Sequence, residues 1–266
     1  MCREDIFRTG KYVLAKLSHQ GGHLMGAKRK AAEKRNSKKG YDNVVDIKPF
    51  QKPSKQVNIL PRNRNQETYV LSLLDETKSI VFGIGPAGTG KTLLAVQVAV
   101  KMFKEGKVDK IIVTRPAVSV DEDLGFLPGT LEEKMAPWTR PIFDVLKEYF
   151  NAAEITGMIA EGIIEISPLA YMRGRTFKRS FILADEMQNA TPNQMKMLLT
   201  RLGDESMMAV TGDLNQADRL KDNGLIDFTR LLEHSDQSCL SVVQFDKGDI
   251  ERHAAVKAVL AVYGDD

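Results

Sequence analysis

The fold is decided by one stretch, which is Ile80-Val81-Phe82-Gly83-Ile84-Gly85-Pro86-Ala87-Gly88-Thr89-Gly90-Lys91-Thr92. Its apolar start predicts a short buried strand, and the apolar residues that follow it predict a helix. Residues 85–92 have the spacing G-x-x-x-x-G-K-[ST], which is the phosphate-binding P-loop, or Walker A motif. A P-loop between a strand and a helix indicates a nucleotide-binding α/β fold with a parallel sheet between helices.

The residue types of the P-loop follow from the way that it binds phosphate. Glycines let the backbone turn so that successive N–H groups point at phosphate oxygens, and the following helix adds the positive end of its dipole. Lys91 can reach the β- and γ-phosphates, and the Thr92 hydroxyl can hold Mg²⁺. We therefore assign phosphate binding to Gly85, Pro86, Ala87, Gly88, Thr89, Gly90, Lys91 and Thr92.

The same stretch also fits the dinucleotide fingerprint G-x-G-x-x-G, from Gly83 to Gly88. That hypothesis needs an acidic residue at the end of the second strand, where this chain has Arg115. An arginine there suits a 2′-phosphate, so a nicotinamide-dependent enzyme remains an alternative. It does not explain the lysine and threonine that end the P-loop, and we favour phosphate hydrolysis.

A second apolar run, residues 181–184, leads directly into Asp185 and Glu186. In P-loop proteins a strand of this kind delivers an aspartate that holds Mg²⁺ beside the phosphates, and we assign that role to Asp185 together with Thr92. Glu186 is placed to orient and deprotonate the attacking water. General-base assistance of this kind contributes about 10²–10⁴-fold.

A third apolar run, residues 208–211, ends in Thr211, Gly212 and Asp213. If this strand lies between the other two, Thr211 and Asp213 face the γ-phosphate, with Gln216 just beyond. Residues 215–218 depart from a guanine-recognition tetrad because Gln216 stands where lysine is expected. We therefore expect ATP as the nucleotide.

Strands and helices alternate from residue 57 onward, which is typical of a parallel sheet covered on both faces. Strands are expected at 80–83, 110–114, 163–167, 181–184, 208–211 and 238–245. Helices are expected at 67–74, 92–105, 141–150, 193–202, 225–233 and 249–262. Residues 115–141 fit no regular element, which indicates a functional insertion. Trp138 within it is equally explained as a core residue of that insertion.

The chain has 266 residues, enough for one large α/β domain at 57–266 and an N-terminal extension at 1–56. Residues 1–65 hold 16 Lys and Arg against five Asp and Glu, although the net charge of the chain is only +3. Few apolar residues lie between 21 and 53, so we expect a flexible basic segment. Its charge indicates single-stranded RNA or another nucleic acid as a partner. A solvated tail and a surface for self-association are alternatives.

Membrane and secretory signals are weak in this sequence. No apolar run approaches the roughly 20 residues of a membrane-spanning helix, so we expect no membrane partner. The first residues lack the pattern of a signal peptide. Cys2 and Cys239 lie far apart and form no metal-binding pattern, which favours a reducing, cytoplasmic location.

Six motifs occur together in the part of the chain from 85 to 213. They are residues 85–92, Thr114-Arg115-Pro116, Leu124-Gly125-Phe126-Leu127-Pro128-Gly129, Leu169-Ala170-Tyr171-Met172-Arg173-Gly174-Arg175-Thr176, Asp185-Glu186-Met187-Gln188-Asn189 and Thr211-Gly212-Asp213. With them the chain resembles the PhoH-like family of ATPases over residues 62–263. The resemblance implies one RecA-like core related to superfamily-one helicases. It also implies ATP binding and hydrolysis and, in some relatives, an association with RNA unwinding or phosphate starvation.

The resemblance carries further roles onto matching positions. Gln66 matches the glutamine that contacts the adenine edge, and Gln188 and Gln216 match glutamines near the γ-phosphate. Arg252 lies in a segment that resembles the arginine–histidine motif of the family. The proline expected after that histidine is Ala254 here, which leaves the geometry of the motif open.

Superfamily-one helicases cleave ATP between two RecA-like domains, of which the second supplies an arginine. Only 53 residues follow Asp213 in this sequence, too few for a second such domain. The arginine therefore comes from the same domain, from a neighbouring subunit, or is not used. We expect a ring or other homo-oligomer in which Arg252, Arg201, Arg173 or Arg175 acts on the neighbour, a contribution of about 10³–10⁵-fold.

The sequence as a whole favours a Mg²⁺-dependent ATPase in which Glu186 activates water. Two other classes stay open. One is an RNA-stimulated motor or helicase, and the other is a nucleotide-gated assembly protein with slow hydrolysis. A kinase fits less well, because Glu186 is placed for water and no acceptor pocket is evident.

Overall fold

The structure is a computed structural model that describes residues 56–116, 131–217, 222–235 and 237–252, together with 255, 256, 259 and 262. The side chains of residues 131–137 are outside this description. The chain divides into two units, residues 1–49 and residues 50–266, and every described residue belongs to the second. The expected basic extension and the Leu-Gly-Phe-Leu-Pro-Gly motif lie outside the described residues.

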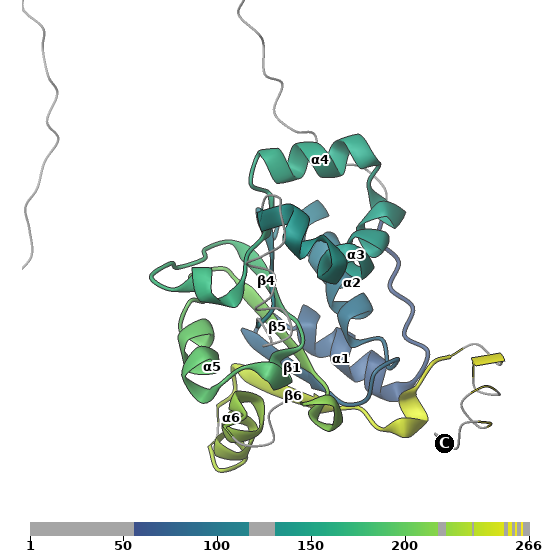
Figure 1. The fold of residues 1–266 in the computed structure, drawn as a ribbon, viewed down its shortest axis with the longest axis vertical. Coiled ribbons are helices and arrows are strands. Elements are labelled where there is room, and N and C mark those ends of the chain that lie inside the picture. Colours follow the sequence, from purple (N-terminus) through teal and green to yellow (C-terminus); the bar gives the residue numbers. More distant parts are fainter. Residues whose placement is uncertain are drawn as a thin grey trace, which may run out of the picture. The chain divides into compact units, whose positions relative to one another are not determined.

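Six strands form one parallel sheet in the order β3-β2-β4-β5-β1-β6 (Figure 1). Their bounds are β1 Ile80–Ile84, β2 Lys110–Thr114, β3 Ile164–Ile166, β4 Ser180–Ala184, β5 Met207–Gly212 and β6 Leu240–Gln244. Because all these pairings are parallel, the carboxyl ends of the strands lie at one edge of the sheet, where ligands bind in open α/β folds. Strand β5 lies between β1 and β4, the arrangement on which the expected site depends.

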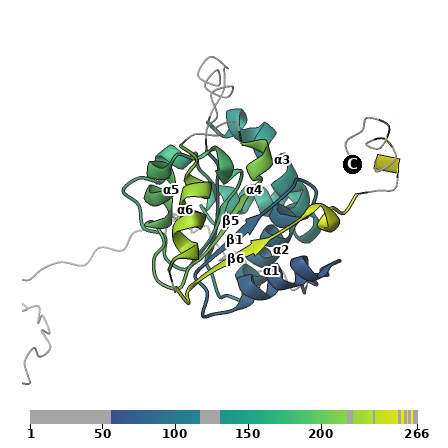
Figure 2. The same ribbon diagram turned by 90° about the horizontal axis from the view of Figure 1, so that it is seen from below.

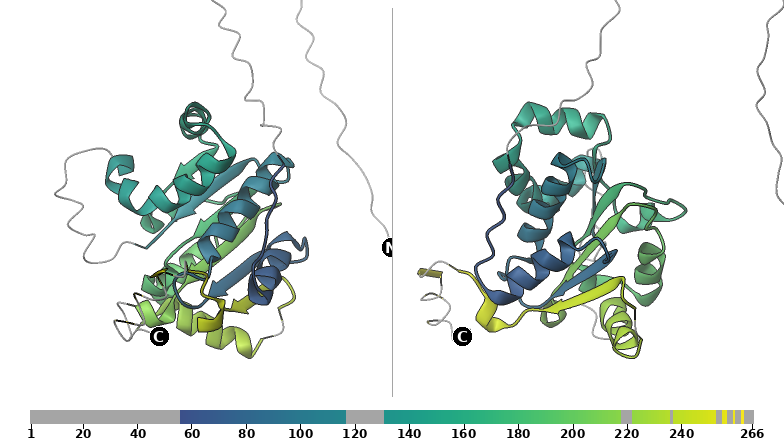
Figure 3. Two further views of the ribbon diagram at one scale, coloured as in Figure 1. Left: turned by 90° about the vertical axis from the view of Figure 1, so that its right-hand side faces the viewer. Right: turned by 180° about the vertical axis from the view of Figure 1, so that it is seen from behind.

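Helices cover both faces of the sheet (Figure 2). Side chains of α1, α2, α3 and α4 join one apolar layer, and side chains of α5 and α6 join the other. Figure 3 shows α2 lying across the strands on the first face. The bounds are α1 Arg64–Leu74, α2 Lys91–Lys104, α3 Leu131–Tyr149, α4 Ala152–Ala160, α5 Pro192–Leu199 and α6 Gly224–Glu233. The predicted α/β class, with a parallel sheet between helices, is confirmed.

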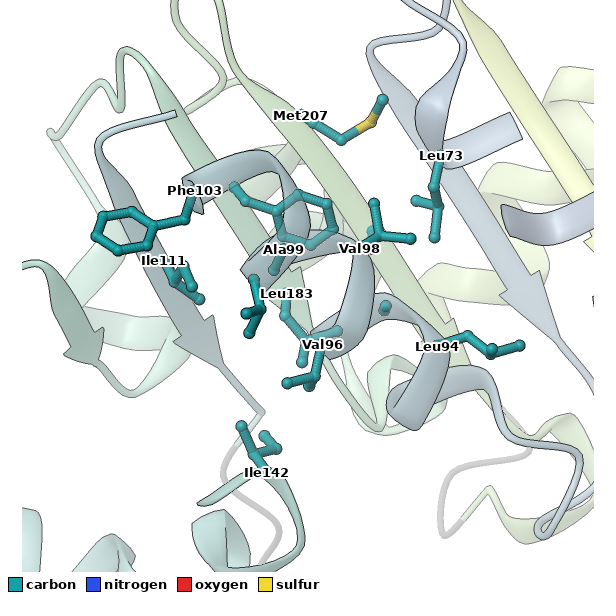
Figure 4. Packing of buried hydrophobic residues seen from close by; sticks show 14 of the residues in the cluster. Leu73, Leu94, Val96, Val98, Ala99, Phe103, Ile111, Ile142, Leu183 and Met207 are labelled. Carbon is teal, nitrogen blue, oxygen red and sulfur yellow. The ribbon is translucent and has the colours of Figure 1, made fainter. Parts of the chain in front are cut away.

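The two layers follow from side-chain alternation along the strands. Val81 and Leu183 face the first layer, and Phe82 and Ile182 face the second. Figure 4 shows the first layer, where Val98 of α2 packs among side chains from the sheet and from neighbouring helices. Burying one such side chain stabilises the fold by about 1.5–3 kcal/mol. Both layers hold the central strands rigidly, and with them the loops at their carboxyl ends.

Two helices differ from the sequence-based expectation. Helix α3 begins at Leu131 rather than at 141, so residues 131–141, which we expected to lie in an irregular insertion, are helical, and Pro137 and Pro141 lie inside the helix. Helix α4 was not predicted. Its capping box was visible in the sequence: Asn151 accepts from the backbone N–H of Glu154 at 2.9 Å, and Glu154 accepts from that of Asn151 at 2.7 Å.

The expected helix at 249–262 also begins too early. Residues 247–249 form a 3₁₀ turn, and residues 250–252 are not helical. Their backbone instead runs beside the P-loop, as described below. Within the described part of the chain, no helix combines the length and the apolar character needed to cross a bilayer.

Candidate functional site

A pocket of about 260 Å³ lies at the carboxyl edge of the sheet, where β1, β4 and β5 end. The P-loop and the start of α2 form one wall, and the ends of β4 and β5 form the other. It is lined by Ala87, Gly88, Gly90, Lys91, Thr92, Leu93, Asp185, Glu186, Thr211, Gly212, Asp213 and Gln216. Most of the residues that the sequence assigned to one site therefore meet in one cavity.

The P-loop leaves β1 through a residue that has to be glycine. Gly85 has φ 149°, and a Cβ built on it would lie 2.4 Å from the carbonyl oxygen of Phe245. The loop then ends at Gly90, which has φ 83° and is the N-cap of α2. The positive end of the helix dipole therefore faces the pocket.

Lys91 carries the positive charge of the pocket. Its buried Nζ donates to the carbonyl oxygens of Gly85 and Pro86, at 2.7 Å each. Burial lowers the pKa of Lys91 below its usual value, and the nearby carboxylates of Asp213 and Glu186 partly oppose that shift. The ammonium is thus bonded only to neutral groups of its own loop, which phosphate oxygens can replace.

A hydrogen bond between Thr92 and Asp185 joins the two walls of the pocket. The Thr92 hydroxyl donates to Oδ1 of Asp185 at 2.9 Å, and the hydroxyl of Thr211 donates to the same oxygen. A hydroxyl and a carboxylate are oxygen ligands of the kind that Mg²⁺ prefers. The donor set at this position therefore fits Mg²⁺, as the sequence predicted for Thr92 and Asp185.

Glu186 follows Asp185 and has a strained backbone, with φ 54°. Its Oε2 accepts from Nε2 of Gln188 at 2.5 Å. Gln188 is only 1% exposed, and its Oε1 accepts from the backbone N–H of Asp213 at 3.1 Å. The structure therefore places Gln188 behind the glutamate as a link from β4 to β5, not among the residues that line the pocket.

Asp213 and Gln216 occupy the end of β5 and the turn after it. Asp213 is buried, and its Oδ2 accepts from the N–H of Ala87 in the P-loop at 3.0 Å. Gln216 is exposed and lines the pocket. Strand β5 is therefore hydrogen-bonded both to the P-loop through Asp213 and to β4 through Gln188.

Gln66, near the start of α1, lies behind the P-loop. Its Nε2 donates to the carbonyl oxygen of Thr89 at 3.0 Å, and its Oε1 accepts from the N–H of Arg62 at 2.8 Å. It is 4% exposed and is not among the residues that line the pocket. The adenine contact carried over from the family resemblance stays a prediction.

Arg252 lies beside the P-loop of its own chain. A Cβ built on Gly88 would be 3.2 Å from Nε of Arg252, and the backbone N–H of Glu251 donates to the carbonyl oxygen of Gly88 at 3.0 Å. The segment that resembles the arginine–histidine motif is thus fixed to the loop by its backbone. The guanidinium group of Arg252 lies beside Gly88, which lines the pocket.

The other three candidate arginines are placed differently. Arg175 forms a two-bond ion pair with Glu165, one bond of which measures 2.7 Å. Arg201 donates to the carbonyl oxygens of Met197 and Arg175. Arg173 is exposed. Arg175 and Arg201 therefore have structural partners within the chain.

Sequence reasoning missed the residues that hold the P-loop from behind. The buried Asp249 accepts at Oδ2 from Nδ2 of Asn65 at 2.7 Å and from the N–H of Asp246 at 2.9 Å. Nδ2 of Asn63 donates to the backbone oxygen of Asp249 at 3.3 Å. Asn63 and Asn65 lie more than 180 residues from Asp249 along the chain, so no local pattern could reveal those two contacts.

The structure also explains the glycine that began the dinucleotide fingerprint. A Cβ built on Gly83 would lie 2.9 Å from the ring of Tyr69, which is fully buried against β1. The residue after β2, Arg115, has its guanidinium 5.8 Å from the ring centre of the half-buried Trp138. Packing therefore accounts for both features without a bound dinucleotide.

Comparison with known proteins gives one family. The family model described as PhoH-like protein matches residues 58–264. A PhoH-like protein of Bacillus subtilis (strain 168) is 43% identical over 232 residues, which are 86% of this chain and 71% of that protein. A PhoH-like protein of Mycobacterium tuberculosis (strain ATCC 25618 / H37Rv) is 45% identical over 207 residues, 77% of this chain and 58% of that protein.

The chain spans only 58% to 60% of the length of the mycobacterial and Synechocystis relatives that it matches. Among solved structures, one match is titled "Sulfolobus solfataricus SWI2/SNF2 ATPase core in complex with dsDNA". It is 14% identical, covers 76% of this chain and 49% of that chain, and has a TM-score of 0.41. That similarity is too low to carry an argument.

Proposed function

The chain belongs to the PhoH-like family, and from that premise we propose that it is a Mg²⁺-dependent ATPase that hydrolyses ATP to ADP and phosphate. One observation supports the proposal above the others. Lys91, Thr92, Asp185 and Glu186, which come from two segments more than 90 residues apart, line a single pocket. These are the groups that phosphoryl transfer to water requires.

Lys91 and the P-loop would bind the β- and γ-phosphates. The ammonium exchanges its bonds to Gly85 and Pro86 for bonds to phosphate oxygens, which bring negative charge to a buried cation. Backbone N–H groups of the loop and the N-terminus of α2 add donors. When bound between Thr92 and Asp185, Mg²⁺ neutralises charge on the β- and γ-phosphate oxygens.

Glu186 would activate the attacking water. A carboxylate oxygen of Glu186 accepts the proton of the water, whose oxygen bonds to the γ-phosphorus as the bond from that phosphorus to the bridging oxygen of ADP breaks. The products are ADP and phosphate. Gln188 is a positioning residue here, because its hydrogen bond holds the carboxylate in place at the pocket wall.

Arg252 is the arginine that we assign to charge stabilisation. Its place over Gly88 favours action on the nucleotide of its own chain rather than on that of a neighbour. The expected homo-oligomer remains a separate proposal, tested by sedimentation with and without ATP. An active monomer would contradict the requirement for a neighbour.

Phosphate release from ATP tests the proposal most directly. We expect turnover that needs Mg²⁺, and we expect the Lys91→Ala variant to lose about 10²–10³-fold in kcat/KM because the pocket loses its cation. Lys147→Ala is a matched control, since Lys147 is an exposed lysine on α3. Wild-type protein that releases no phosphate from ATP, or a Lys91→Ala variant as active as Lys147→Ala, would refute the assignment.

Coupling to RNA is a second proposal, and it rests on the 16 basic residues among residues 1–65 and on the exposed Arg173. It predicts that single-stranded RNA stimulates turnover and that rising salt removes the stimulation. Equal rates with and without RNA would contradict it and would favour a free-standing ATPase or a nucleotide-gated assembly protein.

A further inference from the structure

Both ends of the amide of Gln66 are hydrogen-bonded to the protein. Its donor end holds the carbonyl of Thr89 and its acceptor end holds the N–H of Arg62, in a position that is 4% exposed. The same side chain packs against the loop, because a Cβ built on Gly90 would lie 3.1 Å from Nε2 of Gln66. An amide that recognises a base needs a donor and an acceptor that are available to the ligand.

The neighbours of Gln66 make contacts of the same kind. Asn65 bonds to the carboxylate of Asp249, and two residues later the backbone of Glu251 bonds to the P-loop at Gly88. The P-loop is therefore held by two segments, residues 62–66 and residues 246–252, which we call the P-loop clamp. The clamp contacts the backbone of the loop and thereby sets the direction of its N–H groups.

We infer that Gln66 is a positioning residue for the P-loop and does not select the base, so that the site accepts nucleoside triphosphates with little discrimination between adenine, guanine, cytosine and uracil. The inference rests on the proposed phosphohydrolase function and specifies its substrate class. Turning Gln66 toward a base would leave the buried Thr89 carbonyl without its partner and would break the bond to the N–H of Arg62.

The pocket itself is consistent with this inference. Among the described lining residues, the polar groups are backbone N–H donors, one lysine, hydroxyls, carboxylates and the amide of Gln216 beyond the end of β5, and no side chain is aromatic. The cavity of about 260 Å³ is smaller than the ~300–1,000 Å³ typical of pockets that enclose a whole drug-sized ligand. Its walls therefore match the triphosphate and the metal rather than the base.

The first experiment compares turnover of ATP, GTP, CTP and UTP by the full-length wild-type protein with Mg²⁺. We expect the four kcat/KM values to agree within about tenfold. A site built to hydrogen-bond one base rejects analogues by far more, about 10⁴–10⁵-fold in favourable cases. A preference for ATP above tenfold would overturn the inference, whereas absence of turnover with all four would overturn the proposed function instead.

The second experiment separates phosphate binding from base recognition in Gln66→Ala. Inorganic tripolyphosphate, which has no base, is used as a competitive inhibitor. If Gln66 positions the loop, the KM for ATP, the KM for GTP and the Ki for tripolyphosphate all rise by the same factor, about tenfold. If Gln66 contacts adenine, only the KM for ATP rises and the Ki is unchanged, which overturns the inference.

A glutamine far from the site provides the control. Gln237 is exposed beyond α6, and Gln237→Ala should leave all of these constants unchanged. If Gln66→Ala does not fold, the wild-type comparison of the four nucleotides decides the question alone, because it needs no variant.

Discussion

The two sides of the P-loop are built from the same kinds of polar residue but in opposite ways. On the pocket side, Lys91 is bonded to carbonyl groups of its own loop that a ligand can replace, and the half-buried Glu186 has a strained backbone. On the far side, Gln66 and Asp249 are 4% and 6% exposed and connect segments distant along the chain. The lysine that would bind phosphate has hydrogen-bond partners that a ligand can replace, whereas the residues that hold the P-loop are themselves buried, with partners within the protein.

This difference has an energetic basis. A buried polar group that loses its partner costs about 1–3 kcal/mol, whereas a partly exposed one can turn to water instead. Substitutions on the pocket side should therefore change rates and leave stability almost unchanged. Substitutions in the clamp should lower stability and phosphate binding together.

Glu186→Gln should have the largest effect. The amide cannot accept the proton of the attacking water, so kcat should fall by about 10²–10⁴-fold. Nucleotide affinity by titration calorimetry and the melting temperature should stay near wild type, as expected for the pocket side. Normal turnover by this variant would remove the catalytic role of Glu186.

Gln188→Ala should come next, because it removes the donor that holds Glu186 and leaves the N–H of Asp213 without its partner. A misplaced base costs about 10–10²-fold. We expect the loss in kcat and not in KM, measured by steady-state phosphate release. A loss confined to KM would place Gln188 in nucleotide binding instead.

Asp249→Ala tests the clamp. It leaves Asn65 and the N–H of Asp246 without their acceptor, so the free energy of unfolding should fall by about 1–3 kcal/mol in urea titrations. The matched control is Asp144→Ala on α3, an exposed ion-pair partner, with a change of about 0.5 kcal/mol or less. Equal losses of stability in the two variants would contradict the claim that the clamp contributes more to stability than an exposed ion pair does.

The pH profile should show the smallest effect. Burial lowers the pKa of Lys91 below its usual 10.5, and the charged form binds phosphate, so kcat/KM should fall as pH rises through that lowered pKa. The alkaline limb should therefore lie below pH 10.5. Lys91→Arg keeps its charge and should lack this limb. A limb at or above pH 10.5 in the wild type would contradict the assignment.

Much of this site was predictable because its signals are local. The P-loop at 85–92 and the acidic pair after residues 181–184 each follow a buried strand, so the carboxyl edge of a parallel sheet brings them together. The condition that the third strand, β5, lies between the other two is also met. Periodicity and strand-end position were enough for these features.

The remaining features depend on long-range contacts or on weak local signals. Nothing near Asp249 shows that its carboxylate binds Asn65, and nothing near Gln66 shows that its amide faces inward. Prolines at 137 and 141 concealed the start of α3, because proline inside a helix is disfavoured by local propensity. Whether a side chain is buried, and which group it bonds to, is decided only when the chain is folded.

The position of β1 has a consequence for synthesis on the ribosome. Its two neighbours are β5 and β6, the last two strands in the order of the chain, so the strand that carries the P-loop is made long before either partner. At about 5–20 residues per second, the roughly 160 residues from Ile80 to Leu240 take about 10–30 s to translate. Until translation has passed Leu240, the P-loop strand therefore lacks at least one of its two neighbours in the sheet.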